Sequence, residues 1–174
     1  MDNPLRSRPV PLLQRIMPAL RLDTAFYDEV ATDPSTRGQA FLVVVIAGIL
    51  NGITLRERLG QLAIWGGVFA ALAGWLLWTL VVHVVARVFG NRRGTRSLAR
   101  TLAFANVPSF FLVLATLPDI GWIVRLAVPV WLVITSTTAV QATYAIPRTR
   151  AAVIAATAFI IYMGIGLMLG IVAG

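Results

Sequence analysis

The chain has 174 residues, of which 58% are hydrophobic and only 13% are charged, and it contains no Cys. Soluble domains average about 45–50% apolar and about 25% charged residues, so this composition excludes an ordinary soluble domain. It also excludes intrinsic disorder, which requires low hydrophobicity and a high density of net charge. Without Cys the chain can form no disulfide, no thiolate-ligated metal site and no Cys nucleophile. The net charge of +8 is the difference between 15 basic residues, all of them Arg, and 7 acidic residues.

Residues 1–38 differ from the rest and are predicted to form a cytoplasmic lead-in without a cleavable signal peptide. Four apolar side chains recur there at the spacing i, i+3, i+4, i+7, namely Leu13, Ile16, Met17 and Leu20. This spacing predicts a short amphipathic helix at the membrane surface. A second short helix is expected from Asp23, and Asp33-Pro34 is a helix start signal. The lead-in is interpreted either as a packing cover over the helix ends or as a lipid or partner site.

Residues 39–174 are predicted to form an all-α bundle of five transmembrane helices. A helix needs about 20 apolar residues to cross about 30 Å of hydrocarbon. Five segments approach or exceed this length, the first being the shortest, and they are apolar on all sides rather than along one stripe. They are residues 40–55, 62–86, 101–117, 122–146 and 151–173. The fold class is therefore a polytopic membrane protein.

The distribution of Arg predicts the orientation of these spans. Arg concentrates in short cytoplasmic segments of membrane proteins. With five spans and a cytoplasmic N-terminus, 12 of the 15 Arg fall inside. If the first span did not cross, the bias would vanish. We therefore expect a multi-pass protein of the bacterial inner membrane with its N-terminus in the cytoplasm and its C-terminus outside.

The predicted spans contain no Asp or Glu, and this weighs against catalysis and against cation-coupled transport. Such carriers commonly use buried carboxylates. A single His, no Cys and scattered acids make no metal ligand set, so neither a cofactor nor a metal is expected. His83 is interpreted as a proton relay or pH-sensitive gate, or as an imidazole bonded to a neighbouring helix near the interface.

Polar residues in the third and fourth spans suggest a second functional possibility. Pro108 lies between Asn106 and Ser109, and it predicts a kink whose freed carbonyl needs a partner on this or a facing helix. Thr137 and Gln141 share one helix face at i, i+4. These residues either line a polar path, which His83 could extend, or form hydrogen bonds between helices.

An Arg-rich segment separates the second and third spans. Its five Arg are Arg87, Arg92, Arg93, Arg96 and Arg100. The segment lacks the interleaved aromatic residues that stack on bases, so nucleic acid is not expected. Anionic lipid headgroups attract basic residues by roughly 1 kcal/mol each. These five residues are therefore predicted to bind headgroups or a protein partner.

Small residues recur at four-residue spacing in three spans. The positions are Gly48 and Gly52, then Gly66, Ala70 and Gly74, and then Gly166, Gly170 and Gly174. Such ridges let helix backbones approach closely. They predict tight packing either within the chain or in a homodimer.

Two stretches resemble the Yip-type family, the Ypt/Rab-interacting proteins, and identify the chain as similar to its bacterial members. They are FYDEVATDPSTRGQA (26–40) and LARTLAFANVPSFF (98–111). The acidic Asp-Leu-x-Gly-Pro motif of the eukaryotic lead-in and the Gly-Tyr pair before Pro108 are missing. The resemblance implies five membrane helices with a cytosolic N-terminus. In eukaryotes the family acts in vesicle traffic with small GTPases.

The sequence therefore favours a non-enzymatic membrane scaffold that binds lipids or another membrane protein. The alternative is a small channel or transporter whose polar path runs between the third and fourth spans.

Overall fold

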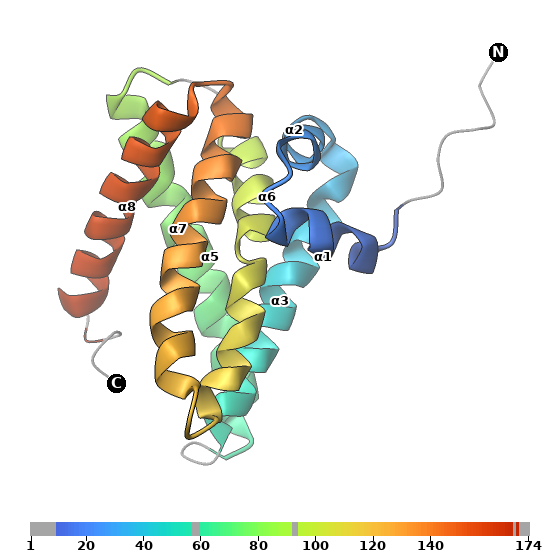
Figure 1. Ribbon diagram of the computed structural model, residues 1–174, viewed down its shortest axis with the longest axis vertical. Helices are drawn as coiled ribbons and strands as arrows, with labels where there is room; N and C mark the ends of the chain where they lie inside the picture. Colours follow the sequence, from blue (N-terminus) through green and yellow to red (C-terminus); the bar gives the residue numbers. More distant parts are fainter. Residues whose placement is uncertain (1–9, 57–59, 92–93, 169, 171–174) are drawn as a thin grey trace.

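The computed structural model describes residues 10–56, 60–91, 94–168 and 170. Within these ranges the chain is helical and forms no strand (Figure 1). Five units are long and apolar enough to cross a membrane, which confirms the predicted fold class. They are α3 (Arg37–Thr54) after the short 3-10 helix η1 (Pro34–Thr36), α5 (Leu62–Val88), α6 (Thr95–Ala105) continued by the 3-10 helix η2 (Val107–Thr116), α7 (Gly121–Tyr144) and α8 (Arg148–Met168).

The third span is where the predicted boundaries were least accurate. Helix α6 begins at Thr95 rather than at residue 101, so the segment that carries Arg96 and Arg100 is helical and not a loop. The α-helix ends at Ala105, and ten residues of 3-10 helix follow from Val107. This change of helix type at Pro108 takes the place of the predicted kink, because proline removes a backbone donor from the α-helical ladder.

The two ends of the bundle differ in what they carry. The upper end in Figure 1 holds α1, α2, the C-terminal ends of α5 and α7, and the N-terminal ends of α6 and α8. We call it the α2 end. The opposite end, here the far end, holds the C-terminal ends of α3 and η2 and the N-terminal ends of α5 and α7.

Two short helices precede the first span, as predicted. They are α1 (Leu12–Leu20) and α2 (Thr24–Thr32). Asp23 caps α2, because its Oδ1 accepts a hydrogen bond from Ala25 N at 3.0 Å. Such caps satisfy backbone donors that lack a partner within the helix.

The start signal at Asp33 is also confirmed. The Asp33 carboxylate accepts hydrogen bonds from Ser35 N at 2.8 Å and from Ser35 Oγ at 2.6 Å. These bonds stabilise the ionised form and hold the pKa of the Asp33 carboxyl below its ordinary value. Helix η1 begins at the next residue and leads directly into α3.

Helix α1 lies across the side of the bundle near the α2 end (Figure 1). Leu13 and Met17 point away from the bundle, with exposed fractions of 79% and 51%. Arg15 points inward and is buried, and its Nη2 donates to Glu29 Oε1 at 2.7 Å. This ion pair joins α1 to α2. The apolar spacing alone did not indicate that Arg15 would be buried.

Glycines hold α3 and α5 in close contact along their length. A Cβ added at Gly48 would lie 2.6 Å from the Cα of Val68, and one at Gly52 would lie 2.6 Å from the Cα of Ile64. On α5 the packed glycine is Gly67, whereas a Cβ at Gly66 would meet nothing within 4 Å. The Gly48–Gly52 ridge thus packs within the chain. Its glycine partner on α5 is Gly67, one residue after the predicted Gly66.

Aromatic rings of α2 and α6 pack together at the α2 end. The Phe26 ring contacts the rings of Tyr27 and Phe104 edge-on, with centroids 5.4 Å and 5.2 Å away. Tyr27 is fully buried, and its hydroxyl donates to the Ala19 carbonyl at 3.3 Å. Burial raises the pKa of this hydroxyl, because ionisation would place a charge in an apolar environment. Helix α2 is therefore part of the core rather than a loose cover.

Candidate functional site

Arg100, one of the residues predicted to bind headgroups, is buried and has a structural role. It is 7% exposed, and its Nε and Nη2 donate to the Val30 and Ala31 carbonyls at 3.1 and 2.8 Å. Ser97 Oγ donates to the same Ala31 carbonyl at 2.6 Å. Because the last carbonyls of a helix lack partners within it, Ser97 and Arg100 cap the C-terminal end of α2. Two of the three guanidinium nitrogens of Arg100 are therefore used within the chain.

Other arginines at the α2 end are exposed. Arg87 and Arg96 belong to the predicted set and reach the surface, as do Arg148 and Arg150 of α8. Arg150 also donates to the Phe89 carbonyl, so α8 is joined to the end of α5. We call Arg87, Arg96, Arg148 and Arg150 the basic patch. The remaining predicted members, Arg92 and Arg93, lie outside the described residues.

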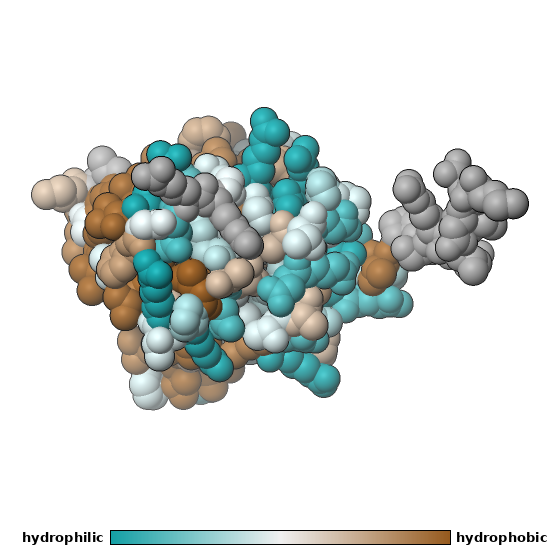
Figure 2. Space-filling view, turned by 90° about the horizontal axis from the view of Figure 1, so that it is seen from above, coloured by the Kyte–Doolittle hydropathy of each residue, from teal (hydrophilic) through white to brown (hydrophobic). Residues whose placement is uncertain are grey.

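Two residues of the basic patch, Arg148 and Arg150, were absent from the predicted set although their place in the sequence indicated them. Arg148 and Arg150 lie after the fourth span, and the topology already placed them on the same side as Arg87 and Arg96. Their charge was used only to predict the orientation of the spans. Figure 2 looks onto this end of the molecule and shows hydrophilic residues over much of it, with hydrophobic residues along parts of its rim.

His83 connects three helices near the α2 end. Its Nε2 lies 3.5 Å from Thr95 Oγ1 on α6, and its Nδ1 lies 3.4 Å from the Tyr144 hydroxyl on α7. These contacts correspond to the predicted alternative of an imidazole bonded to neighbouring helices. They place His83 at the start of the third span, beside Thr95, which precedes Arg96 in sequence, and not at Asn106 and Ser109.

Two backbone carbonyls at the break in the third span accept hydrogen bonds from side-chain hydroxyls. Thr135 on α7 donates its hydroxyl to the Ala105 carbonyl at 2.7 Å. Ser109 donates its hydroxyl to the Asn106 carbonyl at 2.7 Å. Both predicted sources, the span itself and a facing helix, therefore supply a donor. In a medium without water such bonds are required for the change of helix type.

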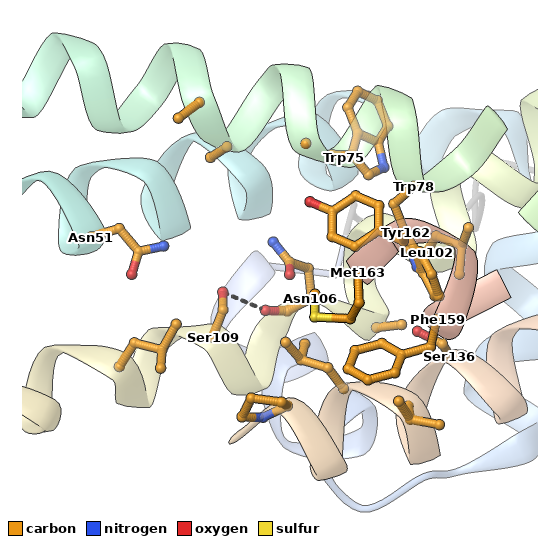
Figure 3. Close-up of a pocket in the computed structure, with 18 of the residues that line it drawn as sticks. Asn51, Trp75, Trp78, Leu102, Asn106, Ser109, Ser136, Phe159, Tyr162 and Met163 are labelled. Carbon is orange, nitrogen blue, oxygen red and sulfur yellow. Dashed lines mark hydrogen bonds between the residues drawn. The ribbon is translucent and has the colours of Figure 1, made fainter. Parts of the chain in front are cut away.

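A cavity of about 360 Å³ lies beside this break, within the membrane-spanning part of the bundle. Its walls come from α3, α5, the α6–η2 junction, α7 and α8 (Figure 3). Helix α5 packs against α3, α6 and α8, but over the described residues it makes no extensive contact with η2 or α7. The cavity lies in the space between α5 on one side and η2 and α7 on the other.

The cavity brings together some of the predicted path residues and excludes others. Asn106 and Ser109 line it, and from α7 the contribution is Ser136 rather than Thr137. The Thr137 hydroxyl donates to the Val133 carbonyl of its own helix at 2.9 Å. Pro108 and Gln141 are not part of the lining. Two of the predicted residues therefore face a common space, whereas Pro108, Thr137 and Gln141 do not line it.

Comparison with protein families gives one match: the Yip1 domain model matches residues 20–170. The chain belongs to the Yip1 family. The match covers α2 through α8 and includes both the basic patch and the cavity. Neither the curated proteins nor the solved structures contain a significant match to the chain. Membership in the Yip1 family and five apolar helices make this a multi-pass membrane protein.

The Yip1 domain described here offers little for metal chemistry. No group of three or more His, Asp or Glu residues that could hold an ion occurs within the described ranges. The chemically distinctive features of the domain are therefore the basic patch and the cavity.

Proposed function

We propose that this Yip1-family protein is a non-enzymatic membrane scaffold that organises anionic lipids around its α2 end. The proposal places that end in the cytoplasm, against the anionic leaflet of a bacterial inner membrane. The observation that carries it is the arrangement of the basic patch. Four exposed arginines lie near the ends of α5, α6 and α8 that meet at the α2 end of the bundle.

The charge distribution between the two ends supports this proposal. Of the described arginines, only Arg56 and Arg125 lie at the far end. The others lie near the α2 end, where Arg15 and Arg100 are buried and Arg150 is exposed but bonded to the Phe89 carbonyl. A cation near an anionic leaflet gains roughly 1 kcal/mol. The exposed arginines can therefore favour anionic over zwitterionic lipids without any single deep site.

The test is lipid selectivity after replacement of Arg87, Arg96, Arg148 and Arg150 by Gln. Protein in nanodiscs of mixed phosphatidylglycerol and phosphatidylcholine is released for native mass spectrometry, and the retained lipids are counted. We expect the anionic preference of the unmodified protein to fall about fivefold for each arginine removed, because about 1 kcal/mol is lost with each. High salt should reduce the preference in the same direction.

The control replaces Arg56 and Arg125 at the far end by Gln and should leave the preference nearly unchanged. An equal loss from both sets, or no anionic preference in the unmodified protein, would contradict the proposal.

Orientation is tested separately with single cysteines, since the chain has none of its own. Cysteine introduced at Thr149 should be protected from an impermeant thiol reagent in intact cells, and cysteine at Asp119 should react.

A further inference from the structure

The cavity has a wall of unusually small side chains. On α5 it is lined by Gly67, Ala70, Ala71 and Gly74. Opposite Gly74 stands Tyr162 of α8, whose hydroxyl would lie 3.1 Å from a Cβ at that glycine. These small residues keep α5 from filling the space between itself and α7. A volume of about 360 Å³ lies within the range of small-molecule sites, about 300–1,000 Å³.

Several polar groups face this space with their hydrogen-bonding capacity unused. The side-chain amides of Asn51 and Asn106 and the hydroxyls of Ser136 and Tyr162 line the cavity. None of them makes a hydrogen bond to another described residue. Figure 3 shows the Asn106 amide and the Tyr162 hydroxyl directed into the same space. An unsatisfied polar group within a membrane costs free energy, so these groups favour a ligand that can bond to them.

The remainder of the lining defines the chemical class of that ligand. Among the described residues that line the cavity none carries a charge, and aromatic rings close one side. The aromatic residues are Trp75, Trp78, Phe159 and Tyr162. A phosphate or carboxylate headgroup would find no cation there, and an unpaired charge in this environment is costly. An apolar chain fits the walls, and a neutral donor or acceptor fits the two amides.

We propose that this cavity binds a neutral single-headed lipid, whose apolar chain carries one hydroxyl or carbonyl group that bonds to the Asn106 amide. The site lies within the spans and apart from the basic patch, so the proposal does not depend on the proposed headgroup selectivity. Entry occurs from the bilayer, where such a lipid is already dissolved. Asn106 supplies both a donor and an acceptor, and it therefore accepts either kind of head.

The experiment uses the full chain in phosphatidylcholine nanodiscs and three photoreactive probes of equal length. These are a diazirine fatty alcohol, the matching hydrocarbon and the matching fatty acid. We expect the alcohol to label residues 67–78 of α5 and 159–163 of α8, and unlabelled fatty alcohol to compete. Asn106→Leu should weaken competition by the alcohol about fivefold, the equivalent of one neutral hydrogen bond. It should leave labelling by the hydrocarbon unchanged.

Gly66→Leu is the matched control, because Gly66 is on the same helix but faces open space. Tyr162→Phe provides a second variant that keeps the ring and removes one hydroxyl from the cavity. The alcohol and hydrocarbon can also be compared on the unmodified chain, so the test does not depend on any variant folding.

Three results would overturn the proposal. The first is labelling of the cavity by the charged fatty acid as strong as by the alcohol. The second is labelling by the alcohol that neither competitor nor Asn106→Leu reduces. The third is ion or solute flux in proteoliposomes that Asn106→Leu abolishes, since this would make the cavity part of a water-filled path.

Discussion

The junction of α2 with α6 and the cavity beside α5 both contain polar side chains inside an apolar bundle. At the junction, Ser97 and Arg100 donate three hydrogen bonds to two carbonyls at the end of α2. In the cavity, the amide of Asn106 and the hydroxyl of Tyr162 have no partner among the described residues. A polar residue in a membrane protein therefore indicates a binding site only where the fold leaves its hydrogen bonds unused.

The same contrast applies to charge. Arg100 is a buried cation of the Arg-rich segment, and the helix end to which it bonds has a partial negative charge. Its burial is therefore a feature of folding. Within the described ranges, the exposed arginines of the basic patch make no such bond except the one from Arg150 to the Phe89 carbonyl, and their remaining donors are available to ligands from outside the chain.

The largest expected effect in this comparison follows Arg100→Ala. Hydrogen bonds to a charged group are worth about 1.5–3 kcal/mol each, and Arg100 makes two of them in a buried position. We expect the free energy of unfolding in mixed micelles, measured by titration with SDS, to fall by about 3 kcal/mol. Protease cleavage within α2 should increase in parallel. Arg96→Ala, one turn earlier and exposed, should change stability by less than about 0.5 kcal/mol.

An intermediate effect is expected for Thr135→Val, which lies between the two regions. The change removes the hydroxyl that bonds to the Ala105 carbonyl at 2.7 Å. Hydrogen bonds between membrane helices average about 0.6 kcal/mol and reach about 1.7, so we expect a loss of about 1 kcal/mol in the same titration. Thr137→Val removes only a bond within its own helix and should have a smaller effect. Equal losses would show that Ala105 is satisfied in another way.

The smallest effect is expected for Asn106→Leu in the absence of added lipid. The amide loses no protein partner, and leucine has a similar size, so stability should change by less than about 0.5 kcal/mol. The same titration measures it. A loss above about 1.5 kcal/mol would mean that Asn106 has a structural role like that of Arg100, and the contrast between the two regions would then fail.

Much of the fold could be predicted because it depends on local properties. Apolar length determines the five spans, and the helix start at Asp33 depends on the two residues after it. The break at Pro108 and the need for a hydroxyl partner also follow from the chemistry of one residue. These predictions required no knowledge of which helices meet.

The role of Arg100 could not be predicted because its partners are distant. Val30 lies 70 residues before Arg100 in the chain, and no local pattern shows that α2 folds back onto α6. In an Arg-rich segment Arg100 resembles the neighbouring arginines.

Gly66 and Gly67 present a similar difficulty, since two adjacent glycines lie on different faces of α5 and only the packing against α3 distinguishes them. The cavity likewise arises from how far α5 diverges from α7.

The winding of η2 has a geometric consequence for the cavity wall. Residues three apart are eclipsed in a 3-10 helix, so Asn106, Ser109 and Leu112, all of which line the cavity, form one straight row along the span. An α-helix turns about 100° per residue, and it would rotate Leu112 about 120° away from the face that Asn106 occupies. Because η2 is a 3-10 helix, Asn106, which is proposed to bind the head of the lipid, and the apolar Leu112 lie on the same face. A change of η2 to α-helix would separate them without altering a single side chain.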